Sequence, residues 1–206
     1  SEVFILYSNQ LFSALRSGFP SMHLNLFRAD SKNALEQLRS GVADMAIYSS
    51  VPSKIKEDPG ELLYQEELVM AVPFSGNGEP EKEAGRENII DSNQLSASSL
   101  IIPVEDSHMG KLLYPLLRSY YVNLEDCYTA DSYSGISLLF QNGYGSAFLP
   151  SRLLAREKTK DYKIYHADPP MRYDLRFMAG ERLKKEKVAA DMLCLIRKQI
   201  QSSEEN

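Results

Sequence analysis

Cysteine is scarce in this chain, and its spacing excludes the structures that cysteines usually build. The 206 residues include two cysteines, Cys127 and Cys194, which lie far apart and outside any CxxC pattern. A disulfide framework needs several cysteines, and a structural zinc site needs closely spaced pairs. We therefore expect two reduced thiols and a cytoplasmic location.

An excess of positive charge and a long apolar run are both absent. Lys and Arg number 23 against 28 Asp and Glu, which gives a net charge of -5. Affinity for nucleic acid comes mainly from clustered basic residues, so this chain should not hold DNA by itself. No apolar stretch approaches the roughly 20 residues of a membrane helix, and no signal peptide is recognisable, so no membrane contact is expected.

Motifs of catalysis and metal binding are also missing. The patterns HxxxH, paired CxxC and GxSxG do not occur. The three histidines are scattered; only His108 stands at a candidate site, where we interpret it as a helix-start residue beside water. The neighbouring carboxylates Glu66 and Glu67 should point apart and be solvated. The sequence therefore predicts no enzyme, no cofactor and no metal.

What the chain does contain is an alternation of strand and helix patterns. The strand patterns are VFILY (3–7), MHLNLFRA (22–29), ADMAIYSS (43–50), 68–73, 100–104, DCYTA (126–130), SAFLP (146–150) and RYDLRFMA (172–179). Helical patterns lie between them, over 11–19, 33–38, 108–121 and 136–141, and a last one covers 186–200. Such alternation is typical of mostly parallel sheets covered on both faces.

One helix-to-strand unit occurs twice. Without gaps, residues 30–48 align with 131–149, pairing Asp30 with Asp131, Ser31 with Ser132 and Ala46 with Ala147. The repeat suggests two α/β lobes: lobe I from 1–70 plus 172–206, and lobe II from 71–171. The alternative, that any two helix-to-strand units share this pattern, stays open.

The GxG spacing of Gly143 and Gly145 raises the question of a nucleotide site. A dinucleotide-binding turn follows a strand and opens a helix. Here the helix comes first, so Gly143 falls at its carboxyl end, where the helix dipole repels phosphate. The glycines therefore end a helix.

Four strand-to-helix junctions carry a serine: Ser8, Ser31, Ser107 and Ser132. Helix N-termini offer free backbone N–H groups, so these junctions could bind a small anion or polar metabolite. The competing interpretation is that the serines only cap helices. Carboxylates at the same junctions, on Asp30, Asp106 and Asp131, weaken the case for a strongly anionic ligand.

Three segments together resemble the effector-binding domain of LysR-type transcription regulators. They are FPSMHLNLFRADSKNALEQLRSGVADMAIYSS, ELLYQEELVMAVP and LLFQNGYGSAFLPSRLLA. The resemblance rests on Phe19-Pro20, on GVADMAI (41–47) and on GYGSAFLP ending at Pro150, and it covers nearly the whole chain. It implies a fold like the type 2 periplasmic binding proteins: α/β, with two Rossmann-like lobes of mixed, mostly parallel sheets joined by a two-strand hinge. It also implies an N-terminal winged helix-turn-helix DNA-binding domain, absent from this chain.

The resemblance also implies which residues bind the inducer between the lobes: Ser8, Asn9, Gln10, Ser31, Pro103, Glu105, Ser107, His108, Ser132 and Tyr133. Arg28 is a possible counter-charge, but strand alternation favours turning it to solvent. The segment 8–20 is about two turns shorter than the family's usual first helix, at about 3.6 residues a turn.

The expected function is therefore a ligand-sensing regulatory domain that binds a small-molecule effector and signals through oligomer rearrangement. Partners would be a second copy in a homodimer, a tetramer in the full-length protein, and DNA only through the missing domain. The apolar residues of 11–19 and 108–121 would contact that second copy or face their own sheets. The alternative function is a solute-binding protein of the same fold used in transport.

Overall fold

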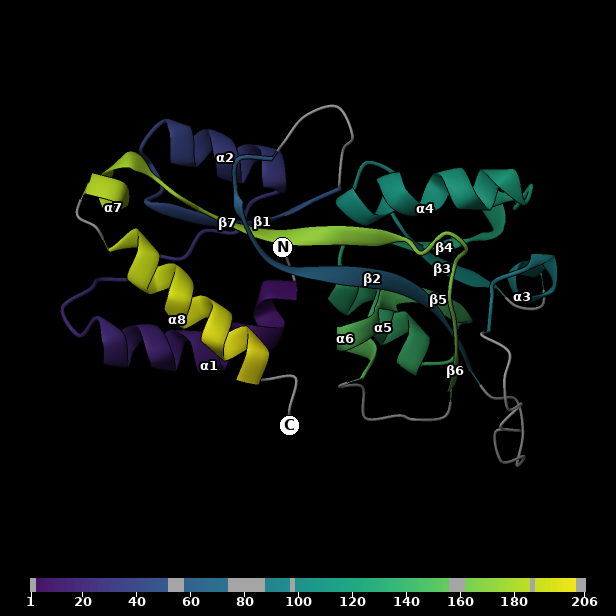
Figure 1. Ribbon diagram of the computed structural model, residues 1–206. Helices are drawn as coiled ribbons and strands as arrows, with labels where there is room; N and C mark the ends of the chain where they lie inside the picture. Colours follow the sequence, from purple (N-terminus) through teal and green to yellow (C-terminus); the bar gives the residue numbers. More distant parts are fainter. Residues whose placement is uncertain are drawn as a thin grey trace. The chain divides into compact units, whose positions relative to one another are not determined.

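The computed structural model describes residues 3–51, 58–73, 88–96, 99–155, 162–185 and 188–202 (Figure 1). The chain divides into two compact units. Unit 1 comprises residues 1–65 and 173–206, and unit 2 comprises 66–172. The chain passes from one unit to the other within strand β2 (Glu61–Pro73) and returns at the start of strand β7 (Arg172–Ala179). Each unit is a layered α/β structure.

Unit 1 is a sheet with helices on both faces. Its strands lie in the order β1 (Met45–Ser50), β7 and the first part of β2, and β1 is antiparallel to β7 with Tyr48 opposite Arg176. Helices α1 (Val3–Gly18) and α8 (Ala189–Ser202) pack together on one face, and α2 (Ser31–Arg39) lies on the other (Figure 1). The short helix α7 (Glu181–Lys185), which the sequence patterns did not predict, follows β7.

The start of the chain differs from the sequence prediction. VFILY is not a strand, because helix α1 begins at Val3 and runs for 16 residues to Gly18. No glycine or proline interrupts residues 3–17, so the β-branched residues at the start continue into the helical pattern that follows. Leu11 and Leu15 of this helix are buried. The helix is therefore longer than the segment 8–20 suggested.

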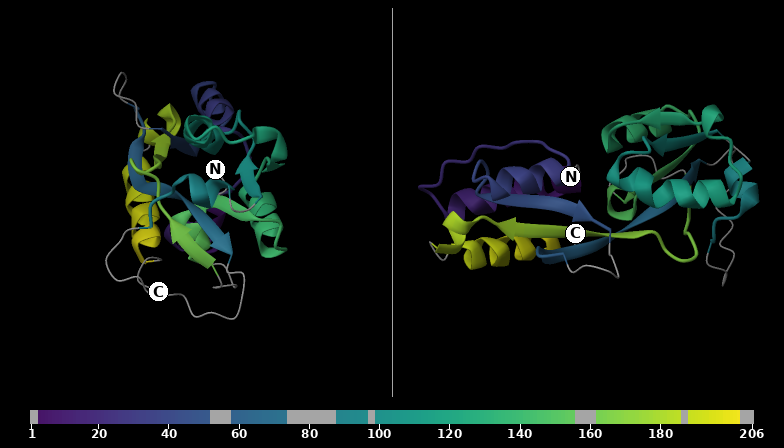
Figure 2. Two further views of the ribbon diagram at one scale, coloured as in Figure 1. Left: turned by 90° about the vertical axis from the view of Figure 1, so that its right-hand side faces the viewer. Right: turned by 90° about the horizontal axis from the view of Figure 1, so that it is seen from above.

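The segment 22–29 was also predicted as a strand and is not one. Its backbone is extended and irregular between α1 and α2, and it bulges outward beside β1 (Figure 2). A strand exists only when its N–H and C=O groups pair with a neighbour, so alternation alone does not produce one. In unit 1, β1 therefore pairs antiparallel with β7 and not with a strand at 22–29.

Unit 2 holds the parallel strands. The order is β2, β5 (Ser146–Pro150), β3 (Leu100–Pro103) and β4 (Tyr128–Ala130), with β6 (Tyr162–Tyr165) on the other side of β2. β3 is parallel to both β4 and β5, while β2 is antiparallel to β5 and β6. β6 was missed, since its sequence YKIY lies in a segment that looked polar throughout.

The helices of unit 2 enclose one apolar core. They are α3 (Ser92–Ser96), α4 (His108–Ser119), the 3-10 turn η1 (Leu124–Asp126), α5 (Tyr133–Gln141) and α6 (Ser151–Leu154). Leu113 and Leu117 of α4 are fully buried in this core, together with Ile136 of α5. For these side chains, as for Leu11 and Leu15 in unit 1, the interpretation that they face their own unit is correct.

The helix-to-strand repeat has a local structural counterpart. α2 and α5 both end in a glycine with φ +75°, Gly41 and Gly143. At each end the glycine N–H and the next N–H donate back to helix carbonyls in a Schellman motif: Gly41 to Leu38 and Val42 to Gln37, Gly143 to Phe140 and Tyr144 to Leu139. The caps Asp30 and Ser132 keep the same spacing from these glycines. In the structure Asp30 therefore corresponds to Ser132, one residue away from its partner in the gapless alignment. Gly143 ends a helix, as predicted.

Candidate functional site at the β3 and β4 edge of unit 2

The candidate site begins where two parallel strands end together. Pro103 pairs with Ala130 at the carboxyl ends of β3 and β4, and the Val104 N–H donates to the Ala130 carbonyl at 3.1 Å. Helices α4 and α5 start just beyond these ends. Carboxyl edges of parallel strands followed by helix N-termini are the usual ligand-binding edge of α/β sheets. Six of the ten predicted ligand-binding residues lie here.

Ser107 caps α4 and uses both of its hydrogen-bonding functions. Its Oγ accepts from the Gly110 N–H at 2.9 Å and donates to the Val104 carbonyl at 2.7 Å. The loop lies so close to the helix that a Cβ at Gly110 would stand 2.2 Å from the Val104 carbonyl oxygen. Ser107 therefore holds the loop over the first turn of α4, and its hydroxyl is already occupied.

Ser132 caps α5 in a different way. Its Oγ accepts from the Gly135 N–H at 3.2 Å and from the Ser134 hydroxyl at 3.4 Å. When Ser134 is the donor of the second contact, the Ser132 hydroxyl hydrogen is left without an acceptor among the described residues. Ser132 is half-buried and adjoins Tyr133, which packs on the core. Of the two cap serines at this edge, Ser132 is the one with a donor to offer.

His108 is the first residue of α4 and is only partly exposed. Burial, with a smaller contribution from the charge of Lys111, lowers its pKa to about 4. Its Nε2 lies beneath the surface, so the prediction of a histidine beside water is wrong in that respect. At neutral pH His108 is an uncharged imidazole at the helix start.

The charged residues at this edge are one ion pair and two further carboxylates. Glu105 pairs with Arg118, and Arg118 also lies 5.6 Å from the Tyr114 ring centre. Both members of the ion pair are about half exposed, with side-chain exposures of 51% and 56%, so the pair contributes little stability. Asp106 and Asp131 are exposed beside it. Pro103 is buried as the last residue of β3 and would offer a ligand only its backbone.

The four remaining predicted residues belong to unit 1. Ser31 is the first residue of α2, and its Oγ donates to the Ser49 carbonyl at 2.9 Å, while Asp30 caps the helix. Ser8, Asn9 and Gln10 lie inside α1 and not at its N-terminus. The expectation that they follow a strand at a helix start is therefore wrong, because no strand precedes them in the described residues.

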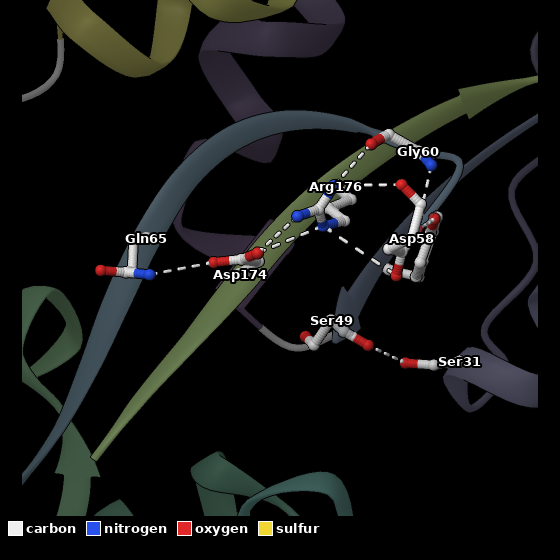
Figure 3. A network of polar contacts seen from close by, with 8 residues as sticks. Ser31, Ser49, Asp58, Gly60, Gln65, Asp174 and Arg176 are labelled. Atoms are coloured by element: carbon white, nitrogen blue, oxygen red, sulfur yellow. Dashed lines mark hydrogen bonds and ion pairs between the residues drawn. The ribbon is translucent and has the colours of Figure 1, made fainter. Parts of the chain in front are cut away.

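Sequence reasoning missed a network of charges in unit 1 (Figure 3). Arg176 of β7 donates to Asp174 Oδ2 through Nε and Nη2, at 3.2 and 2.7 Å, and to the Gly60 carbonyl at 2.7 Å. Gln65 donates to the other oxygen of Asp174 at 3.2 Å, and Tyr48 donates to Asp58. Residues 174 and 176 share one face of β7, so strand alternation was a signal that could have pointed to this pair.

Burial and charge shift the pKa values in this network. Burial, followed by the hydrogen bond to Asp58, raises the pKa of Tyr48. Burial acts to raise the pKa of Asp58, but hydrogen bonds from Tyr48, Gly60 and Ser50 and the charge of Arg176 lower it overall. The Asp174 hydrogen bond and charge outweigh burial and raise the pKa of Arg176. Tyr48 and Arg176 therefore keep their protons and Asp58 stays ionised, which are the states that their hydrogen bonds need. This agreement indicates that the network is structural.

A second missed feature is the buried carboxyl group of Glu66 in unit 2. Glu66 is 1% exposed; its Oε1 accepts from Ser151 Oγ at 2.8 Å and from the Glu67 N–H at 2.9 Å. Oε2 is buried with no hydrogen-bond partner among the described residues. Glu67 instead reaches His166 Nδ1 at 2.8 Å. The two carboxylates do point apart, but Glu66 is not solvated.

No helix in the described part of the chain is long and apolar enough to cross a membrane. Nor do the described residues contain a group of three or more His, Cys, Asp or Glu side chains that could hold a metal ion.

Two compact α/β units, with strands β2 and β7 carrying the chain between them, define the class of type 2 periplasmic-binding-protein-like domains. Within that class, the family model described as "LysR substrate binding domain" matches residues 7–182, and the chain belongs to this family. A search of curated protein sequences finds no significant match.

Solved structures of OxyR proteins share this fold. The reduced form of OxyR from N. meningitidis has 19% identity and a TM-score of 0.69, covering 96% of this chain and 91% of that chain. An H2O2-bound mutant of Corynebacterium glutamicum OxyR has 16% identity and a TM-score of 0.66, covering 97% and 62%. The reduced OxyR regulatory domain from Pseudomonas aeruginosa has 18% identity and a TM-score of 0.63, covering 93% and 91%. At these identities the likeness concerns the fold alone.

Proposed function

We propose that this chain is the effector-binding part of a LysR-type transcription regulator, and that a polar group of a small-molecule effector binds at the β3 and β4 edge of unit 2. Family membership supports the regulatory role. The observation that carries the location is the pair of helix N-termini, α4 and α5, at one sheet edge, with the Ser132 hydroxyl hydrogen left over for a ligand.

The charges favour an uncharged polar or weakly anionic group. Helix N-termini attract negative charge, but Asp106 and Asp131 stand at the same edge, and His108 is neutral at physiological pH. A carboxamide, a hydroxyl or a single carboxylate fits this balance better than a phosphate does. Signalling through oligomer rearrangement would follow if the effector stabilised one arrangement of the protein over another.

Thiol chemistry is a less suitable basis for sensing at this site. Burial, followed by the charge of Asp126, raises the pKa of Cys127. The thiolate is the reactive form of cysteine, so a raised pKa makes Cys127 a poor nucleophile at neutral pH. We therefore favour reversible binding of a metabolite over oxidation of this cysteine.

The test is a thermal-shift screen of amino acids, hydroxy acids, aromatic carboxylates and sugars, followed by calorimetry on the best compound. At least one should raise the melting temperature with concentration, as expected for a ligand of the folded state. Ser132→Asp keeps a capping oxygen but removes the hydroxyl donor, and should weaken binding about tenfold. Ser119→Ala, an exposed serine of α4, is the matched control. Unchanged affinity of Ser132→Asp would place the effector elsewhere.

A further inference from the structure

Asn142 is followed by glycine, the sequence in which an asparagine side chain reacts most readily with its own backbone. The amide nitrogen of the next residue can attack the side-chain carbonyl carbon, Cγ, and glycine has no side chain to hinder that attack. Asn142 and Gly143 are both exposed at the end of α5. The other Asn-Gly pair of the sequence, 77–78, lies outside the described residues.

The folded end of α5 holds the side chain of Asn142 away from this reaction. Its Nδ2 donates to the Leu138 carbonyl at 2.8 Å, so the side chain folds back along the helix. Its ψ angle of 11° makes the Gly143 nitrogen nearly eclipse the backbone nitrogen of Asn142. Ring closure needs the Gly143 nitrogen to eclipse Cβ instead, because Cβ carries Cγ. The two reacting atoms are therefore kept apart while Asn142 has this conformation.

The attacking nitrogen is also occupied. The Gly143 N–H donates to the Phe140 carbonyl at 3.0 Å, and the next N–H, of Tyr144, donates to the Leu139 carbonyl at 3.2 Å. An amide nitrogen attacks after it loses its proton, and a hydrogen-bonded N–H gives up its proton only when the bond opens. Both obstacles therefore disappear when the last turn of α5 opens.

The last turn is the part of α5 that opens most easily. Residues 141–144 are exposed, whereas Ile136 near the start of the helix is fully buried. Helix ends with few buried contacts open at a low cost in free energy. The reactive pair therefore lies where the helix is least stable.

We propose that Asn142 is a deamidation site, with water as the co-reactant, and that the reaction proceeds through the open form of the last turn of α5. The Gly143 nitrogen forms a bond to Cγ of Asn142 while the Cγ–Nδ2 bond breaks. The proton lost by the Gly143 amide leaves on the released ammonia. Water then opens the cyclic imide at either carbonyl carbon, which leaves aspartate or isoaspartate at position 142.

The product cannot restore the end of the helix. Aspartate has no Nδ2 donor for the Leu138 carbonyl, and its negative charge lies at the end of the helix dipole that is already negative. Isoaspartate adds a methylene group to the backbone, which displaces the Gly143 N–H from the helix carbonyls. α5 leads directly into β5 (Figure 1). Deamidation therefore turns a reversible opening at this point into a permanent one, and the inference does not depend on where an effector binds.

Peptide mapping by mass spectrometry tests the proposal. The 206-residue chain is incubated at neutral pH in buffer and in denaturing urea, and the converted fractions of Asn142 and Asn77 are followed with time. In urea both asparagines precede glycine in an unfolded chain, so they should react at similar rates. In buffer Asn142 should still react, but at least about tenfold more slowly than in urea, because only the open form reacts.

A variant that opens the helix end without changing the reacting pair makes the test specific. Gln141→Gly lowers the helix propensity of the last turn, so it should speed conversion of Asn142 about threefold to fivefold in buffer and leave the rate in urea unchanged. Ser119→Gly, at the exposed end of α4, is the matched control and should change neither rate.

Three outcomes would overturn the proposal. The first is an equal rate for Asn142 in buffer and in urea, because the folded turn would then give no protection. The second is conversion in urea with none in buffer, because the folded protein would then not be modified. The third is a rate in buffer that Gln141→Gly leaves unchanged. Asn142→Asp, which copies one product, should speed amide exchange at 143 and 144 about twofold to fivefold; unchanged exchange would contradict the effect on the helix end.

Discussion

Ser151 donates a hydrogen bond to the buried carboxyl group of Glu66 at 2.8 Å, joining the first residue of α6 to the strand in which the chain enters unit 2. The carboxyl group is nearly inaccessible to solvent, so its hydrogen bonds determine how much free energy its burial costs. Burial raises the pKa of Glu66, and the hydrogen bonds from Ser151, Glu67 and Arg152 offset that rise only in part.

Removing the Ser151 hydroxyl should therefore destabilise unit 2. Ser151→Ala leaves Glu66 Oε1 with one donor fewer in a buried position, and we expect a loss of about 1–3 kcal/mol in the free energy of unfolding. Urea denaturation measures it. Ser119→Ala removes an exposed hydroxyl that bonds only within α4 and should change stability by less than about 0.5 kcal/mol. Equal effects of the two changes would contradict the role given to the Ser151 hydrogen bond.

Glu66 should also make stability depend on pH. Its pKa is raised in the folded protein, so the unfolded chain releases this proton at a lower pH than the folded chain does. The stabilisation is full below the ordinary carboxyl pKa and is lost as pH rises through the folded-state value. Glu66→Gln removes this dependence. The free energy of unfolding of the wild type relative to Glu66→Gln should therefore fall as pH rises above the ordinary carboxyl pKa of about 4.5; a constant difference would contradict the raised pKa.

His108 should have the opposite effect on pH dependence. Its pKa of about 4 in the folded protein lies below the ordinary value, so the unfolded chain takes up a proton first as pH falls. Its contribution is complete at neutral pH and is lost as pH falls below about 6.5 toward 4. His108→Gln should consequently lose less stability than the wild type between about pH 7 and pH 5. An imidazole NMR titration with a midpoint near about 6.5 would refute the assignment.

Arg176 should be the most sensitive position in unit 1. Asp174 is 4% exposed, and Arg176→Met would leave its charge buried without its cation. Loss of one partner of such a pair costs about 3–5 kcal/mol, whereas replacing both partners by apolar groups is often nearly neutral. We expect the double variant Asp174→Leu with Arg176→Met to recover most of the loss in urea denaturation. A double variant as unstable as the single one would mean that the contacts of Arg176 to the Gly60 loop dominate.

Two glycines offer a comparison of steric and conformational cost. Gly110→Ala places a Cβ 2.2 Å from the Val104 carbonyl oxygen, while at Gly143 nothing lies within 4 Å but φ is +75°. Gly143→Ala should cost about 1–2 kcal/mol and leave effector binding intact. Gly110→Ala must displace the loop between β3 and α4, so it should cost about 1–3 kcal/mol and also weaken effector binding. Calorimetry with the effector found in the screen measures the binding affinity of each variant, which should fall for Gly110→Ala and stay unchanged for Gly143→Ala.

The elements that were predicted correctly are those whose signals are local. The helix end at Gly143, the helix start at Ser132 and the apolar run of β5 each depend on residues close together in the sequence. The burial of Glu66 could not be predicted, because it depends on α6, which lies 85 residues further along the chain. In sequence, Glu66 is simply a charged residue beside another charged residue.

The two errors at the start of the chain have related causes. The apolar content of 3–7 and the alternation of 22–29 are real, but each is compatible with more than one structure. Residues 3–7 continue into a helix that no glycine or proline interrupts before Gly18. Residues 22–29 need a partner strand to become a strand themselves. Sequence alone places Ser107 and Ser132 at helix starts, but only the hydrogen bonds distinguish the hydroxyl that is occupied from the one that can donate.

Among the described strands, β1 is the terminal strand of its sheet, which has a practical consequence for work on the purified protein. Apolar side chains at Leu26 and Phe27 beside an unpaired strand edge favour association of identical chains at high concentration. A dimer formed in this way would become more populated as the protein concentration rises. Assembly is therefore best measured by sedimentation over a range of protein concentrations.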